Sequence, residues 1–120
     1  MAWKLIVRAG PKVERSRYDQ LDDALDALEE RARALAEDAT GSAVDLKYRR
    51  FEPVEQVVAR LELSGPERLM PKVRAGLDVR GDGSTEAYLG HVNRDVLAPR
   101  KGDTTYGALR RALASSGQAR

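Results

Sequence analysis

The chain has 120 residues and no cysteine, which excludes disulfides, thiolate metal sites and cysteine nucleophiles. Its length predicts one domain, and 21 Lys and Arg against 19 Asp and Glu leave a net charge of +2, which is not the dense basic field of a strong nucleic-acid binder. No apolar stretch is long enough for a signal peptide or a membrane span, so we expect a cytoplasmic protein that does not enter a membrane.

The first elements predicted along the chain are two strands joined by a tight turn. Residues 3–8 alternate between apolar and polar side chains, which is typical of a half-buried strand. Its apolar face comprises Trp3, Leu5 and Val7. Gly10 and Pro11 predict a turn, and residues 12–17 predict a more polar strand that returns beside the first.

A long amphipathic helix is predicted next, from about Tyr18 to Ala39. Its apolar stripe recurs at three- and four-residue spacing and comprises Leu21, Ala24, Leu25, Leu28, Ala32, Leu35 and Ala39. Asp19 is the expected N-cap, and Gly41 is expected to end the helix. Each buried leucine contributes roughly 1.5–3 kcal/mol, so the stripe must pack on a sheet or on another helix.

Four further strands are predicted in the block that follows. They are expected at residues 44–51, 57–63, 72–80 and 85–92. Their inward side chains include Val57, Ala59, Leu61, Leu63, Val73, Ala75, Leu77 and Val79. Gly81 and Gly83 predict a hairpin turn between the last two strands, because glycine adopts positive φ without steric cost. Residues 93–98 fit either a strand end or a short helix.

The C-terminal part predicts a second, shorter helix over about 104–115. Its apolar stripe comprises Tyr106, Leu109 and Leu113. Residues 1–115 therefore predict a single α+β domain, and residues 116–120 a frayed tail. The expected architecture is a mostly antiparallel sheet in the order ββα-ββββ-α, packed on the long helix.

The motifs favour structural roles over catalysis or metal binding. Residues 78–83 resemble a calcium loop, but Arg80 occupies a ligand position and Leu89 stands where a bidentate glutamate is needed. The only histidine, His91, is predicted on the opposite strand face from Glu86 and Tyr88, which prevents a local acid–base pair. We therefore expect no enzyme activity, no metal and no cofactor.

The outward face of the strand block is the first candidate functional surface. Its candidate residues are Arg49, Phe51, Val58, Arg60 and Arg74. Arginine beside exposed apolar side chains is typical of protein interfaces. The leading hypothesis is a non-catalytic interaction or self-association module that binds a protein partner or forms a homo-oligomer. A simpler interpretation is that the second helix packs on this face.

The basic opening hairpin supports nucleic-acid binding as the alternative function. Its cations are Lys4, Arg8, Lys12, Arg15 and Arg17. In layout, residues 3–39 look similar to the small strand-plus-helix DNA-binding modules at the front of some phage-type integrases, a resemblance that implies phosphate contacts from these cations. It covers about a third of the chain and includes no diagnostic residue, so it assigns no family. The same charges also suit a hairpin that must resist edge-to-edge aggregation.

Overall fold

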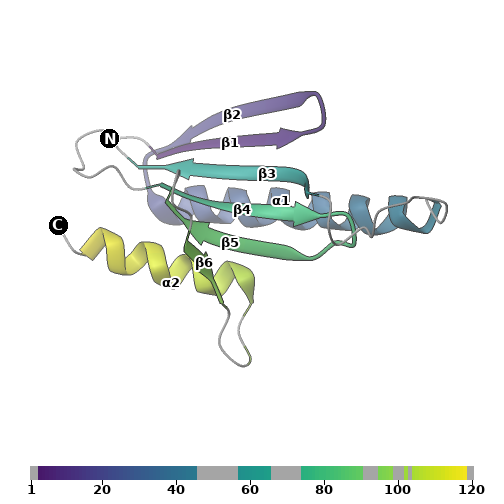
Figure 1. The fold of residues 1–120 in the computed structure, drawn as a ribbon. Coiled ribbons are helices and arrows are strands. Elements are labelled where there is room, and N and C mark those ends of the chain that lie inside the picture. Colours follow the sequence, from purple (N-terminus) through teal and green to yellow (C-terminus); the bar gives the residue numbers. More distant parts are fainter. Residues whose placement is uncertain are drawn as a thin grey trace.

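The computed structural model of the protein describes residues 3–45, 57–65, 74–90, 95–98, 102 and 104–118. These residues form an α+β fold in the order ββαββββα, which confirms the predicted class and element order (Figure 1). The strands are β1 (Trp3–Ala9), β2 (Lys12–Tyr18), β3 (Val57–Ser64), β4 (Arg74–Arg80), β5 (Thr85–Leu89) and β6 (Asp95–Leu97). The helices are α1 (Leu21–Asp45) and α2 (Thr105–Gln118). The strands form one antiparallel sheet in the order β2-β1-β3-β4-β5-β6.

The opening hairpin forms as predicted, with Ala9 and Lys12 closing a two-residue turn. Gly10 has a φ of 61°, which suits the first central position of the type II′ turns that hairpins favour. β1 lies between β2 and β3, and its predicted apolar face is buried: Trp3, Leu5 and Val7. β2 is an edge strand and ends at Tyr18, the residue at which the long helix was expected to begin.

α1 has the predicted apolar stripe but different ends. The buried members of the stripe are Ala24, Leu25, Leu28, Ala32 and Ala39. The first helical hydrogen bond is accepted by the Gln20 carbonyl, so Gln20 rather than Asp19 is the N-cap residue. The predicted stop at Gly41 is wrong, because Gly41 stays helical and α1 continues to Asp45. The strand predicted over 44–51 therefore begins inside α1, and its remainder lies outside the described residues.

β3, β4 and β5 form the centre of the sheet, with two local departures from the prediction. A β-bulge places Val57 and Val58 together opposite Arg80, so Val57 is 41% exposed instead of facing the core. β5 ends at Leu89, because Gly90 has a φ of 94° that interrupts the extended backbone. Within residues 93–98, for which the sequence fitted either a strand end or a short helix, the structure has the strand β6.

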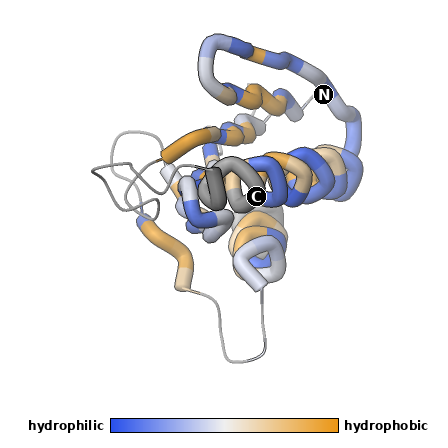
Figure 2. The backbone as a smooth tube through the Cα atoms, turned by 90° about the vertical axis from the view of Figure 1, so that its right-hand side faces the viewer, coloured by the Kyte–Doolittle hydropathy of each residue, from blue (hydrophilic) through white to orange (hydrophobic). Residues whose placement is uncertain are grey.

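Both helices pack on the same face of the sheet. α1 contacts β1, β3 and β4, and α2 contacts β5 and β6 (Figure 1). In Figure 2 the tube of α1 changes between hydrophobic and hydrophilic within each turn, as an amphipathic helix requires. Side chains from both layers join one core, which includes Leu28, Leu61, Leu77, Leu109 and Leu113. The opposite side of the sheet, called the outer face below, therefore packs against neither helix.

α2 is capped at its start and is longer than predicted. The Thr104 hydroxyl accepts a hydrogen bond of 3.0 Å from the Gly107 amide, as an N-cap residue does. The predicted stripe is confirmed, because its three members are buried: Tyr106, Leu109 and Leu113. The helix extends to Gln118, which places residues 116–118 in α2 rather than in a frayed tail.

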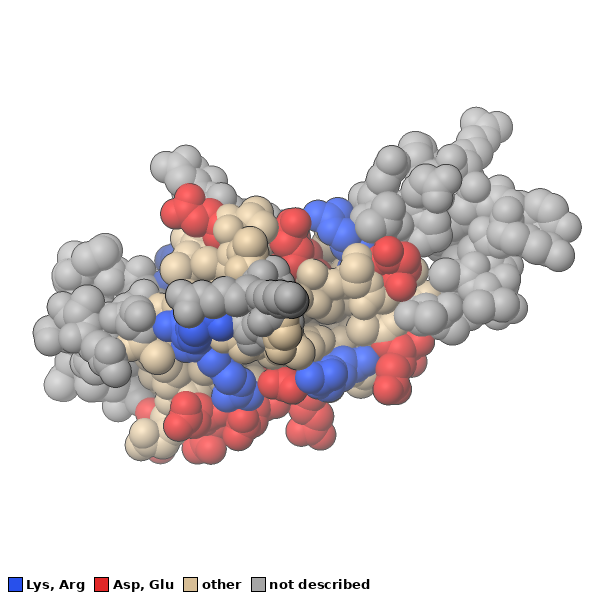
Figure 3. Space-filling model, turned by 90° about the horizontal axis from the view of Figure 1, so that it is seen from below, with Lys and Arg blue, Asp and Glu red and all other residues tan. Residues whose placement is uncertain are grey.

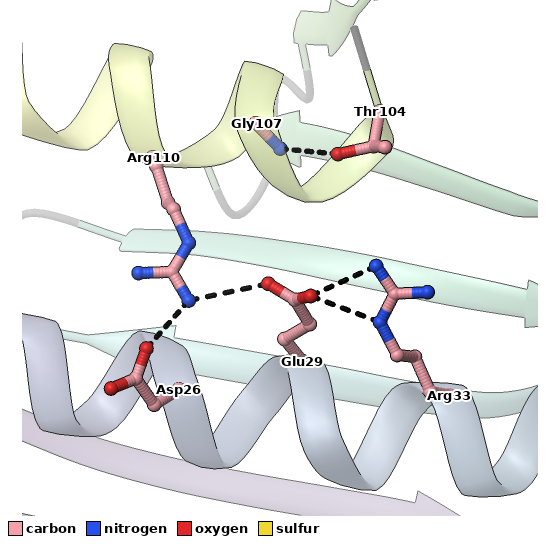
Figure 4. Close-up of polar contacts among 6 residues, drawn as sticks. All are labelled: Asp26, Glu29, Arg33, Thr104, Gly107 and Arg110. Carbon is pink, nitrogen blue, oxygen red and sulfur yellow. Dashed lines mark hydrogen bonds and ion pairs between the residues drawn. The ribbon is translucent and has the colours of Figure 1, made fainter.

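An ion-pair network joins α1 to α2 across their seam (Figure 4). The Arg110 guanidinium donates to Asp26 at 2.8 Å and to Glu29 at 3.2 Å. Burial would lower the pKa of Arg110, but the hydrogen bonds to both carboxylates outweigh it and the pKa is raised. Arg33 pairs with Glu29 at 2.9 Å and lies 4.7 Å from the centroid of the Tyr106 ring. Figure 3, which views the molecule from below, shows basic and acidic side chains next to one another on this side of the molecule.

Candidate interaction surface

The outer face is formed by every second residue of each strand, because successive side chains of a strand alternate between its two sides. The register aligns these residues in rows that cross the sheet. The first row comprises Val13, Arg8, Arg60, Asp78 and Glu86. The second row comprises Arg15, Ile6, Glu62, Gly76, Tyr88 and Val96. The third row comprises Arg17, Lys4, Ser64 and Arg74.

A two-point ion pair between β3 and β4 lies in the first row. Arg60 Nε donates to Asp78 Oδ1 at 2.8 Å, and Arg60 Nη2 donates to Asp78 Oδ2 at 3.4 Å. The Asp78 side chain is 8% exposed and that of Arg60 is 35% exposed, so the carboxylate is the buried partner. The hydrogen bond to Asp78 is the main reason that the pKa of Arg60 is raised, against a smaller opposing effect of burial. Arg60 therefore neutralises a buried charge.

Two further ion pairs bridge neighbouring strands of the outer face. Arg80 Nη2 lies 3.2 Å from Glu86 Oε1 across β4 and β5. Arg8 Nε lies 3.4 Å from Glu62 Oε1 across β1 and β3. Their partly exposed side chains are screened by water, so such pairs contribute about 0–1 kcal/mol of stability each. Each pair reduces the net positive charge that its arginine adds to the outer face.

The ring of Tyr88, in the second row, lies over Gly76 on the neighbouring strand β4. Tyr88 is 4% exposed, and a Cβ atom added at Gly76 would overlap its hydroxyl and ring. The ring thus occupies the space that a side chain on β4 would otherwise fill. A hollow of about 50 Å³ lies beside it, lined by residues that include Ile6, Glu62, Ser64, Arg74, Tyr88 and Gly90. Ligand pockets for small molecules enclose about 300–1,000 Å³, so this hollow is too small to be one.

Three arginines of the second and third rows remain available to a partner. Within the part of the chain that the structure describes, no hydrogen bond or ion pair engages the side chains of Arg15, Arg17 or Arg74. Arg17 and Arg74 belong to the same row and are separated by the two strands between β2 and β4, a distance of about 14 Å at the usual strand spacing. This row joins cations from both predicted sites.

Exposed valines accompany these charges. Among the described residues, the exposed large hydrophobic side chains are Val13 (41%), Val57 (41%), Val58 (37%) and Val96 (59%). By the register, all four lie on the outer face or at the bulge that borders it. The surface thus combines apolar side chains with arginines that have no bonded partner among the described residues, and arginine is enriched at protein interfaces.

The predicted interaction residues do not all assemble. Val58 and Arg74 are exposed on the outer face, which leaves both in place for an interaction. Arg60 is engaged with Asp78 and is the least available of the set. Arg49 and Phe51 lie outside the described residues. The interpretation in which the second helix covers this face is wrong, because α2 packs on the same side of the sheet as α1.

The predicted nucleic-acid-binding cations divide between the two sides of the sheet. Lys4, Arg8, Arg15 and Arg17 lie on the outer face. Lys12 pairs with Ala9, whose side chain packs against the core, so Lys12 lies on the helix side. Four of the five hairpin cations therefore share one surface.

Sequence reasoning missed two features of this surface. The inward prediction for Leu77 and Val79 put Asp78 on the outward face, yet Asp78 is buried, with Arg60 on β3 and Glu86 on β5 directly opposite it. The burial of Tyr88 against Gly76 was also missed, although a glycine inside a strand is a signal of close approach. His91 lies outside the described residues.

The described residues were also considered for metal binding, for membrane spans and for similarity to known proteins. Among the described residues, no group of three or more His, Asp or Glu side chains is placed to hold a metal ion. None of the described helices has the length and apolar character needed to cross a membrane. Comparisons with protein-family models, with curated proteins and with solved structures found no match.

Proposed function

We propose that this protein is a non-catalytic interaction module that binds a protein partner through the outer face of its sheet. The observation that carries the proposal is the placement of both described helices on one side, so that neither of them covers the other side of the six-stranded sheet. That side bears exposed valines beside arginines that make no ion pair with the described residues, and arginine is one of the residue types in which interface energy is concentrated.

Charge reversal in the third row tests this function. We expect the double variant Arg17→Glu, Arg74→Glu to lose the protein complexes that the wild type captures from an extract of its source cells. Any self-association seen by sedimentation velocity should be lost as well. Both side chains are exposed and outside any ion pair of the described residues, so the thermal unfolding midpoint should not change.

A matched control is Arg111→Glu, an exposed cation on α2 in the helix layer. It makes the same charge change away from the outer face and should retain every complex. The proposal fails if the wild type captures nothing and remains monomeric at high concentration. It also fails if the double variant captures the same proteins as the wild type.

Nucleic-acid binding is the second candidate, because the register aligns Arg17, Lys4 and Arg74 in one row. If phosphates bind there, affinity must fall steeply with salt as counterions are released. We expect Arg15→Ala with Arg17→Ala to make the slope of log K against log salt for duplex DNA shallower by about 2, since each phosphate contact contributes about 0.9. Fluorescence anisotropy between low and near-physiological salt measures this slope.

Lys12→Ala is the control for this measurement, because Lys12 belongs to the same hairpin but lies on the helix side of the sheet. Its slope should equal that of the wild type. An equal reduction by Lys12→Ala would indicate attraction to the net charge of the hairpin without a defined surface. Absence of binding at low salt would remove nucleic-acid binding as a function.

A further inference from the structure

The free edge of β2 presents a backbone that can pair with another strand. Among the described strands, β2 is the last on its side of the sheet, and β1 occupies its other edge. In a two-residue hairpin the residues that close the turn are hydrogen-bonded to each other, and this pattern then alternates along the strand. Because Ala9 and Lys12 close the turn, the backbone groups of Val13, Arg15 and Arg17 point toward the free edge.

The same three residues place their side chains on the outer face. Arg15 and Arg17 make no ion pair with the described residues, so their charges remain available beside the unpaired backbone. Glu14 does not compensate them, because its side chain lies on the helix side and bonds Arg31 at 2.7 Å. That hydrogen bond lowers the pKa of Glu14 and keeps it ionised. A strand added here meets two positive charges on one face.

A second copy of this chain does not suit the edge. In an antiparallel pair of two β2 strands, the registers that align at least five residues are centred on Glu14, Arg15 or Ser16. The first places Glu14 opposite Glu14, the second places Arg15 opposite Arg15, and the third places Arg15 opposite Arg17. Like charges directly opposite each other destabilise strand pairing. Each register therefore opposes self-pairing.

We propose that the β2 edge binds an extended segment of a partner protein that carries acidic residues at alternate positions. The segment adds a seventh strand to the sheet, with main-chain hydrogen bonds supplying affinity and carboxylates opposite Arg15 and Arg17 supplying specificity. This inference rests on the proposed function, since it names the partner chemistry and the part of the surface that recognises it. Charge complementarity selects this occupant over a second copy.

Labelled peptides test the proposal by fluorescence anisotropy with the full chain. The probe is a ten-residue peptide of alternating Glu and Thr, and a Lys–Thr peptide of the same length is its counterpart. We expect the Glu–Thr peptide to bind at least tenfold more tightly than the Lys–Thr peptide. Arg15→Glu with Arg17→Glu should reverse this preference, whereas Lys12→Glu, on the other side of the strand, should change it less than twofold.

Backbone methylation separates strand addition from simple charge attraction. Methyl groups on alternate amides face β2 in one version of the Glu–Thr peptide and face away in the other. We expect the version whose methyl groups face β2 to lose binding, because these methyl groups block the main-chain hydrogen bonds to β2. The version whose methyl groups face away should retain binding. Equal binding of both versions, or equally tight binding of a twelve-nucleotide single-stranded DNA, would overturn the proposal.

Failure of this inference differs from failure of the proposed function. If no peptide binds while protein capture still depends on Arg17 and Arg74, the inference is wrong and the outer face remains an interaction surface. If no peptide binds and protein capture does not depend on Arg17 and Arg74, both the inference and the proposed function are wrong.

Discussion

Replacing Gly76 with alanine is expected to lower the free energy of unfolding by about 1–3 kcal/mol, the usual cost of forcing extra atoms into a packed site. The added Cβ atom would overlap the hydroxyl and ring of Tyr88, which is packed against Gly76 and 4% exposed. Gly76 lies on β4 in the middle of the sheet, so its backbone cannot move away without disturbing the pairing with β3 and β5. The ring must therefore leave its site. Urea denaturation of the wild type and the variant measures the difference.

The control for this prediction is the same substitution in a Tyr88→Ala background. Removing the ring should itself destabilise the protein by about 3 kcal/mol, as truncation of a buried aromatic side chain does. Once the ring is absent, Gly76→Ala should be neutral or stabilising by about 0.5–1 kcal/mol, because alanine restricts the unfolded chain more than glycine. An equal loss in both backgrounds would show that the ring is not the cause.

Arg60→Ala is expected to destabilise the protein by about 2–4 kcal/mol, because it leaves the Asp78 carboxylate buried without its partner. The loss exceeds that of an ordinary surface ion pair, since the Asp78 side chain is only 8% exposed. Thermal and urea unfolding both report it. The prediction also makes Arg60 a poor probe of partner binding, because a lost complex could reflect lost stability.

Two comparisons decide whether the buried charge is responsible. Arg74→Ala removes an arginine from the same face without a carboxylate partner among the described residues, and should change stability by less than about 0.5 kcal/mol. Arg60→Met combined with Asp78→Leu replaces both charges by apolar groups and should recover most of the loss. Equal effects of Arg60→Ala and Arg74→Ala would contradict the prediction.

Local periodicity in the sequence determined most of the elements. The three- and four-residue spacing from Leu21 to Ala39 defines the buried stripe of α1, and it requires no knowledge of what covers it. The alternation of Ala75, Leu77 and Val79 likewise defines the inward face of β4. The ends of elements were less predictable, because a glycine costs only about 1 kcal/mol in a helix and α1 continues through Gly41 to Asp45.

Tertiary structure decided what the surface can do. The alternation pattern placed Asp78 outside the core but could not show that side chains on β3 and β5 would enclose it, because the strand neighbours are set by sheet order. The row of Arg17, Lys4 and Arg74 likewise exists only through the register of four strands from distant parts of the chain. The side of the sheet on which α2 packs also depends on the tertiary structure. The apolar stripe of α2 could pack on any apolar surface, and in the fold it joins the core that α1 also forms.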